Sequence, residues 1–347
     1  MTARSRLWLR ATRAPGLLLG FAVALCVVAE STAFAEKFPS HPIRIIVPFE
    51  PGGSTDVIAH LIADRLATTL GQHLVVENHP GGDAGAVGLK VAADAAPDGY
   101  TLLFGSPSPL AIGPTIYPHA DYDPAKRFAP VALIATSPQV LVVNPHVPAK
   151  SVHDFVAYAK ANPGKIKFAS PGFGTEPHLL GELLKATAGI NIVHVPYKAS
   201  TRAIADLAAG HVQMLFDGPA VIAPQIAAGR LRALAVASEA RTPLIAEVPT
   251  MIESGFGRFI ANYWAAVAAP SGTPDKIVGR LNAAINDALR TSDVQAALAK
   301  LGADAKIGSP QDAATFIAAE SAKWAVVAKA AGVKAAGVTP TGLIADP

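Results

Sequence analysis

Short apolar segments alternate with helix-like segments along most of the chain, and this alternation limits the possible folds more than any other property of the sequence. The strand-like segments are rich in β-branched residues and cover positions 43–47, 74–76, 101–104, 166–169, 212–216 and 234–237. The helix-like segments repeat apolar residues every three or four positions and cover residues 57–70, 152–161, 179–188, 203–209 and 277–289. Strands separated by helices of about 10–15 residues are typical of parallel sheets with crossover helices. The sequence therefore predicts an α/β protein with parallel sheets.

Two longer apolar runs, residues 131–143 and 263–268, indicate how the chain is divided. If both runs cross from one half of the protein to the other, residues 138–259 form one lobe, and residues 36–137 together with 260–347 form the other. The alternative is that both runs are central strands of one large sheet. We favour two lobes because the 312 residues after position 35 are many for a single core.

Residues 1–35 have the pattern of a secretory signal peptide. Four arginines without an acidic residue precede a nearly continuous apolar run at 16–29, and A-F-A at 33–35 supplies a small-residue cleavage site. We expect cleavage after Ala35 and export to the periplasm. An uncleaved membrane anchor is less favoured because the apolar run is short for a membrane span. A lipoprotein anchored at Cys26 is rejected because a leucine, not a small residue, precedes that cysteine.

Composition and missing motifs exclude several classes of protein. Cys26 is the only cysteine, so the exported chain has neither disulfides nor cysteine-built zinc sites. Cleavage leaves 25 basic and 25 acidic residues without a basic block, which argues against a nucleic-acid partner. The sequence has no Walker A, G-x-S-x-G or H-E-x-x-H motif, and no later run has the length of a membrane span. We therefore expect a soluble protein with no cofactor, no metal and no catalytic residues.

One local arrangement, a strand followed by a Gly-rich turn and a helix, occurs twice. The first turn is P-G-G-S-T-D at 51–56, and the second is S-P-G-F-G-T at 170–175. Glycine lets the backbone approach a ligand, and Ser or Thr is placed to cap the helix that follows. The first N–H groups of a helix lack intrahelical partners and attract anions. Either turn alone could be a simple connection, but the pair predicts a carboxylate or phosphate held at the carboxyl ends of the strands.

The sequence offers weaker catalytic candidates. Asp56 and His60 are four residues apart on a predicted helix, as are His178 and Glu182, and such pairs can serve a metal or acid–base chemistry. We favour polar helix faces, because a catalytic metal needs a third ligand that the sequence does not identify. Asp217 follows the strand at 212–216 and either faces the ligand or caps the next segment.

A series of motifs runs in order through the chain after residue 35. They are P-I-R-I-I-V-P-F at 42–49, P-G-G at 51–53, V-V-E-N at 75–78, P-D-G-Y-T-L-L at 97–103, F-A-S at 168–170, G-T at 174–175, H-L at 178–179, H-V-P-Y-K at 194–198, F-D at 216–217, V-P-T at 248–250 and G-T-P at 272–274. Together they resemble the Bug proteins, the TctC-like substrate-binding proteins of the tripartite tricarboxylate transporter system. Each motif is weak alone, but their order makes the resemblance specific.

The resemblance implies a type II, two-lobed periplasmic binding protein, in which two α/β domains joined by crossing strands close on a small ligand. In relatives, backbone amides and hydroxyls of the two turns hold a ligand carboxylate. Carried over to this sequence, the ligand-binding residues are Gly52, Gly53, Ser54, Thr55, Asp56, Ser106, Ser108, Ser170, Gly172, Gly174, Thr175, His178 and Asp217. The implied partners are a small organic acid and the membrane permease subunits of such a transporter, with the receptor itself a monomer.

Four positions depart from the family pattern. Glu50 replaces a small residue or proline, and His79 replaces an arginine. Asp83 interrupts the glycine stretch at 81–85, and Ala199 replaces a glycine. Glu50 either points outward or selects a ligand with a cationic or hydroxyl group. The expected function is capture of a small organic carboxylate for transport. The alternatives are a receptor whose loaded form contacts a sensor protein and, less favoured, an exported hydrolase that uses His178 or His60.

Overall fold

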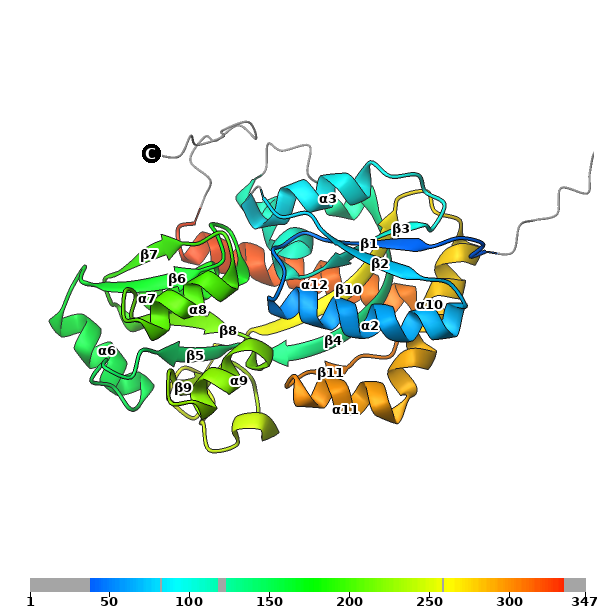
Figure 1. Ribbon diagram of the computed structural model, residues 1–347. Coiled ribbons are helices and arrows are strands. Elements are labelled where there is room, and N and C mark those ends of the chain that lie inside the picture. Colours follow the sequence, from blue (N-terminus) through cyan, green and yellow to red (C-terminus); the bar gives the residue numbers. More distant parts are fainter. Residues whose placement is uncertain (1–37, 82, 118–122, 258, 334–347) are drawn as a thin grey trace, which may run out of the picture. The chain divides into compact units, whose positions relative to one another are not determined.

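The computed structural model describes residues 38–333 except 82, 118–122 and 258 (Figure 1). The predicted signal peptide with its cleavage site after Ala35, and the tail from residue 334, lie outside the described residues. Within the described part, no helix has both the length and the apolar character needed to cross a membrane. The chain from His41 onward forms one unit, and both sheets and the pocket belong to it.

The first sheet has six strands in the order β11-β4-β10-β3-β1-β2. They are β1 (Ile43–Val47), β2 (Leu74–Asn78), β3 (Thr101–Gly105), β4 (Phe128–Pro138), β10 (Asn262–Pro270) and β11 (Asp304–Ala305). β1 is parallel to β2 and β3, since the helices α2 (Ser54–Leu70) and α3 (Ala86–Ala93) return the chain between these strands. β10 is antiparallel to β3 and β4, and β11 is antiparallel to β4.

The second sheet has five strands in the order β7-β6-β8-β5-β9. They are β5 (Val140–Val143), β6 (Ile166–Ser170), β7 (Ile192–Pro196), β8 (Met214–Asp217) and β9 (Arg232–Val236). β6 is parallel to β7 and β8, whereas β5 is antiparallel to β8 and β9. The helices of this part are α6 (Val152–Ala161), α7 (Glu176–Ala188), α8 (Ser200–Ala208) and α9 (Pro219–Ala227).

The two sheets with their helices confirm the α/β class and the two-lobed fold, but the expectation of purely parallel sheets is wrong. Only Gln139 separates β4 of the first sheet from β5 of the second, so one extended segment serves both. The chain returns to the first sheet as β10. A strand that arrives directly from the other lobe needs no crossover helix and can therefore pair in the antiparallel sense.

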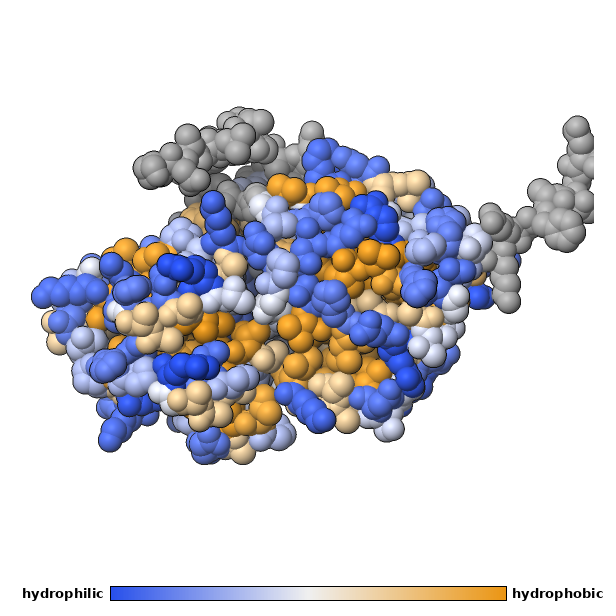
Figure 2. Space-filling model, in the orientation of Figure 1, coloured by the Kyte–Doolittle hydropathy of each residue, from blue (hydrophilic) through white to orange (hydrophobic). Residues whose placement is uncertain are grey.

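The remaining helical segments include α12, which packs against both lobes. They are η1 (Asp83–Gly85), η2 (Ser108–Ile112), α4 (Gly113–Ile116), α5 (Pro124–Arg127), η3 (Pro243–Ile245), α10 (Asp275–Arg290), α11 (Ser292–Lys300) and α12 (Pro310–Ala330). α10 packs on α2, and α12 packs against β4, η2 and α7 (Figure 1). Trp324 of α12 shares one apolar core with Trp264 of β10 and Phe168 of β6, so this core extends across both sheets. Figure 2 shows the molecule from the same side, with hydrophilic residues around orange apolar patches near its middle.

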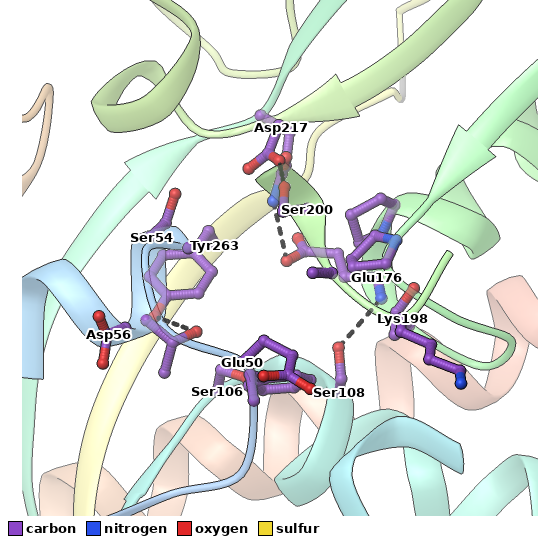
Figure 3. Close-up of a pocket in the computed structure, with 18 residues that line it drawn as sticks. Glu50, Ser54, Asp56, Ser106, Ser108, Glu176, Lys198, Ser200, Asp217 and Tyr263 are labelled. Atoms are coloured by element: carbon purple, nitrogen blue, oxygen red, sulfur yellow. Dashed lines mark hydrogen bonds between the residues drawn. The ribbon is translucent and has the colours of Figure 1, made fainter. Parts of the chain in front are cut away.

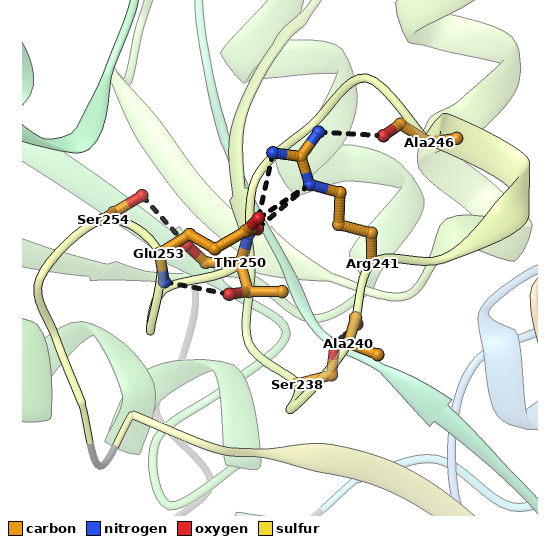
Figure 4. A network of polar contacts seen from close by, with 7 residues as sticks. All are labelled: Ser238, Ala240, Arg241, Ala246, Thr250, Glu253 and Ser254. Atoms are coloured by element: carbon orange, nitrogen blue, oxygen red, sulfur yellow. Dashed lines mark hydrogen bonds and ion pairs between the residues drawn. The ribbon is translucent and has the colours of Figure 1, made fainter.

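A polar network holds the segment that leads from β9 back to β10 (Figure 4). Arg241 forms an ion pair with Glu253, with Nε 3.0 Å from Oε2 and Nη2 3.0 Å from Oε1. The guanidinium lowers the pKa of Glu253 to about 2. The Thr250 N–H donates to the same carboxylate over 2.6 Å, and Arg241 also donates to the Ala246 carbonyl. These contacts fix the path of the chain as it returns to the first sheet.

Candidate functional site

A pocket that is partly open to solvent lies between residues of the two sheets (Figure 3). Most of its first side comes from the β1–α2 turn and from the segment after β3. The second side comes from the turns that precede α7, α8 and α9. The lining residues are Phe49, Glu50, Gly53, Ser54, Thr55, Asp56, Ser106, Ser108, Gln139, Pro171, Thr175, Glu176, Pro177, Lys198, Ala199, Ser200, Asp217 and Tyr263.

Three helices begin at the pocket wall: α2 at Ser54, α7 at Glu176 and α8 at Ser200. Among the described residues, the N-cap side chains of these three helices form no capping hydrogen bond, so the expectation that Ser or Thr of the two turns caps α2 and α7 is wrong. Gly53 is the N-cap residue of α2, and the Thr175 hydroxyl before α7 donates to the Gly172 carbonyl over 2.7 Å instead. The first amides of α2 and α8 therefore remain available to an anion.

The chain does cap helices elsewhere. Ser151 accepts from the N–H of Asp154 at the start of α6, and Ser309 accepts from the N–H of Asp312 at the start of α12. At its start, α7 has fewer N–H groups free to bind an anion than α2 and α8 have. The Glu176 N–H donates to Ser108 Oγ over 3.1 Å, and the next residue is a proline, which has no N–H. This bond also joins the segment after β3 to the second sheet's helix, so it ties the two sides of the pocket together.

Asp56 stabilises the first turn. Its Oδ2 accepts from the N–H of Gly52 over 2.9 Å, and its Oδ1 accepts from Asn78 Nδ2 over 2.8 Å. Figure 3 shows its carboxyl turned away from the pocket. Gly52 has a φ of +85°, a conformation that favours glycine, and contributes shape rather than lining.

Ser54 and Thr55 face the pocket from the first turn of α2. Thr55 Oγ1 accepts from Tyr263 Oη over 3.1 Å, and burial raises the pKa of Tyr263. The Ser54 hydroxyl is buried near Asp217, whose pKa it lowers, but it has no hydrogen bond of acceptable geometry within the described residues. A buried hydroxyl without a partner is unfavourable, and a ligand oxygen in the pocket would satisfy it.

The second turn is shaped from behind by two histidines. His178 Nδ1 accepts from the Gly174 N–H over 3.2 Å, and His194 Nε2 lies 2.7 Å from Ser170 Oγ. The two rings stack with centroids 3.9 Å apart, and burial lowers the pKa of His178 to about 3 and that of His194 to about 4. Both rings are therefore neutral near pH 7.

Two acids of the pocket wall, Asp217 and Glu176, are buried, and burial raises the pKa of both. Asp217 Oδ2 accepts from the Ser200 hydroxyl and its Oδ1 accepts from the Gly218 N–H, while burial raises its pKa to about 6. Glu176 Oε2 accepts from Gln139 Nε2 over 3.1 Å, and burial raises its pKa to about 8. Glu50 is half-buried and lines the pocket rather than pointing outward.

The structure brings together most, but not all, of the sequence-predicted ligand residues. The pocket lining includes Gly53, Ser54, Thr55, Asp56, Ser106, Ser108, Thr175 and Asp217. The lining of the pocket does not include Gly52, Ser170, Gly172, Gly174 and His178. His60 is also outside the lining, 3.5 Å from Asp56 and more than half exposed. No cluster of three or more potential metal ligands occurs among the described residues.

Sequence reasoning missed Gln139, Glu176, Ser200 and Tyr263 as lining residues. A signal existed for two of them. Gln139 is a polar residue inside the apolar run at 131–143, and Tyr263 starts the second such run. Both residues lie where the chain passes between the lobes, so their polar side chains can line the pocket there.

Comparison with known proteins identifies relatives in sequence and in structure. A sequence model of the tripartite tricarboxylate transporter family receptor, TctC, matches residues 58–333. Protein BugT of Bordetella pertussis is 40% identical over 318 residues, which cover 91% of this chain and 97% of BugT. The structure of R. palustris Rpa4515 with adipate has a TM-score of 0.83 and 37% identity, covering 86% of this chain and 99% of that one. MatC from Rhodopseudomonas palustris with bound malate has a TM-score of 0.80 and 33% identity, covering 84% and 99%.

These relatives match over nearly their whole length, and the family match includes the second sheet, the first sheet except β1, and the pocket-lining residues after Asp56. Sequence and fold therefore agree on one assignment. The chain belongs to the tripartite tricarboxylate transporter receptor family and is a solute-binding protein of the Bug type.

Proposed function

We propose that the protein binds a small organic carboxylate in the pocket. The observation that carries this proposal is the convergence of the N-termini of α2 and α8, which have no side-chain cap among the described residues, on one space between the lobes. Such amides bind anions without an arginine. Adipate in Rpa4515 and malate in MatC support the same ligand class.

The first amides of α2 and the hydroxyls of Ser54, Ser106 and Ser108 bind the carboxylate from one side, and the N-terminus of α8 faces it from the other. The two sides belong to lobes formed by residues 36–137 with 260–347 and by 138–259, and closure of the lobes encloses the ligand. Asp56, His178 and the glycines of both turns keep the backbone in place for binding.

The protein is exported with its signal peptide removed after Ala35 and works in the periplasm as a monomer. Its loaded form delivers the acid to the membrane subunits of a tripartite tricarboxylate transporter. The family assignment and the leader pattern of residues 1–35 support this part of the proposal.

A thermal-shift screen of organic acids on protein purified from the periplasm tests the proposal. A carboxylate present at 100 times its Kd should stabilise the fold by about 2.7 kcal/mol and be recovered unchanged. Phosphate and the corresponding alcohols serve as controls. The proposal fails if no carboxylate raises the melting temperature, or if the ligand is consumed.

A further inference from the structure

Glu176 is the least exposed acid of the pocket wall, at 1% relative exposure. Its carboxyl points into the pocket in Figure 3. Oε2 accepts from Gln139 Nε2, but Oε1 has no hydrogen-bond partner in the described part of the chain. Gln139 Oε1 also lacks a partner among the described residues. Two buried oxygens at one wall of the pocket therefore lack hydrogen-bond partners that a polar group of a ligand would supply.

The charges around Glu176 favour its neutral form. Glu320 of α12 and Asp217 of β8 oppose ionisation, and Lys323 of α12 is the cation that favours it. Tyr263 of β10 is uncharged near pH 7 because burial raises its pKa, and His178 on α7 is neutral because burial lowers its pKa to about 3. With desolvation as the largest effect, the pKa of Glu176 rises to about 8. The side chain is thus a carboxylic acid at pH 7.

We propose that Glu176 binds the ligand as a neutral carboxylic acid, with its Oε1 hydroxyl donating a hydrogen bond to an oxygen of the organic anion. Gln139 holds the carboxyl in position through Oε2. This inference rests on the proposed function and adds a specificity-determining residue to it. A donor at this wall favours acids with a second oxygen acceptor over monocarboxylates with an apolar tail. Ionised Glu176 would instead repel the anion, since two like charges in a buried site are strongly unfavourable.

The proposal predicts a pH dependence with a defined sign. Above its pKa, Glu176 must be reprotonated before the anion binds, so affinity is nearly full at pH 7 and falls as the pH rises through 8. For a pKa of about 8, the affinity at pH 9 should be about tenfold weaker than at pH 7. Asp217, with a pKa of about 6, is ionised throughout this interval.

Titration calorimetry with succinate, glutarate and adipate between pH 6.5 and 9 tests this, with hexanoate as the chain-length control for adipate. Glu176→Gln keeps a neutral donor and should bind at pH 7 within a few-fold of the wild type, without the loss at pH 9. Glu50→Gln removes another acid of the lining and should keep the wild-type pH profile. The wild type and Glu176→Gln share every other titrating group, so the difference between their two profiles isolates Glu176.

Proton uptake by the wild type gives a second measurement that needs no folded variant. Calorimetry at pH 8.5 in buffers of different ionisation enthalpy should show uptake of more than half a proton per ligand bound. Binding with no uptake, or an equal loss of affinity at pH 9 in Glu176→Gln, overturns the role of Glu176 and leaves the proposed function intact. No binding of any acid by the wild type overturns both.

Discussion

At the scale of single residues, the polar groups near the pocket divide into those that face the ligand space and those that hold a turn in shape. Ser54 and Glu176 present buried oxygens without partners to the pocket, as far as the described residues show. Asp56 and His178 instead use their acceptor atoms on backbone N–H groups of the turns. Sequence alone placed Ser54, Asp56 and His178 in one class, because spacing predicts proximity to a turn but not which way a side chain points.

Ser54→Ala should weaken binding of the best carboxylate about tenfold, because it removes a buried hydroxyl that has no hydrogen bond of acceptable geometry within the described residues and can donate to the ligand. The thermal stability without ligand should change little. Ser151→Ala is the matched control: it removes the cap of α6 and should lower the free energy of unfolding by about 1 kcal/mol without changing affinity. Calorimetric binding and thermal unfolding of both variants check this, and equal affinities for wild type and Ser54→Ala would contradict it.

The buried histidine pair should make the fold acid-sensitive. The pKa of His194 in the folded protein is about 4, below the ordinary 6.5, so the unfolded chain takes up a proton first as the pH falls. Stability should therefore be full above pH 6.5 and decline between pH 6.5 and 4, by roughly 2 kcal/mol for this ring at pH 4.5.

His194→Gln should show a smaller drop in melting temperature between pH 7.5 and 4.5 than the wild type. The exposed His73, changed to Gln, is the control and should leave the drop unchanged. An identical drop in all three proteins would show that the pair does not determine the acid sensitivity.

At the scale of elements, the position of α7 depends on close packing against β6. Gly181 in the middle of α7 faces Phe168, and a Cβ there would lie 2.1 Å from a ring carbon. The close approach keeps the N-terminus of α7 at the pocket wall.

The two turn motifs and most strands were predictable because short β-branched runs and glycines are local signals. Helix α12 was not, because its Ala-rich sequence has no clear apolar stripe, and its burial depends on distant partners such as β4.

Gly181→Ala should destabilise the fold by about 1–3 kcal/mol, because the added methyl overpacks the α7–β6 interface. Gly279→Ala is its counterpart in α10, where a Cβ would meet nothing within 4 Å. That change should be neutral or stabilise by up to about 1 kcal/mol, since alanine is the better helix former. Chemical denaturation measures both, and similar stabilities for the two variants would contradict the packing argument.

At the scale of the whole molecule, the two sides of the pocket touch across several short contacts. The Glu176 N–H donates a hydrogen bond to Ser108 Oγ, and a Cβ added to Gly218 would lie 3.0 Å from Ser54 Oγ.

The two-lobed fold was predictable from the apolar runs at 131–143 and 263–268. The mixed direction of the sheets did not, because strand direction depends on pairing between distant segments. Sequence motifs indicated the family, but no spacing rule indicated the raised pKa of Glu176, because that shift arises from burial.

Gly218→Val should hold the lobes apart and weaken ligand binding by at least about tenfold, because the larger side chain meets Ser54 when the pocket is closed. Gly218 has a φ of −73°, so valine suits the backbone. Gly257→Val, at a position where a Cβ meets nothing within 4 Å, is the control. Small-angle scattering should show that saturating ligand compacts the control but not Gly218→Val; equal compaction of both would contradict the account.

A crystal structure with the most stabilising carboxylate from the screen tests the binding of a small organic anion between the lobes most directly. We predict a carboxylate enclosed by both lobes, with an oxygen within hydrogen-bond distance of the first amides of α2 and of Ser54 Oγ. A ligand bound elsewhere on the molecule, or held in the pocket without contact to either group, would contradict it.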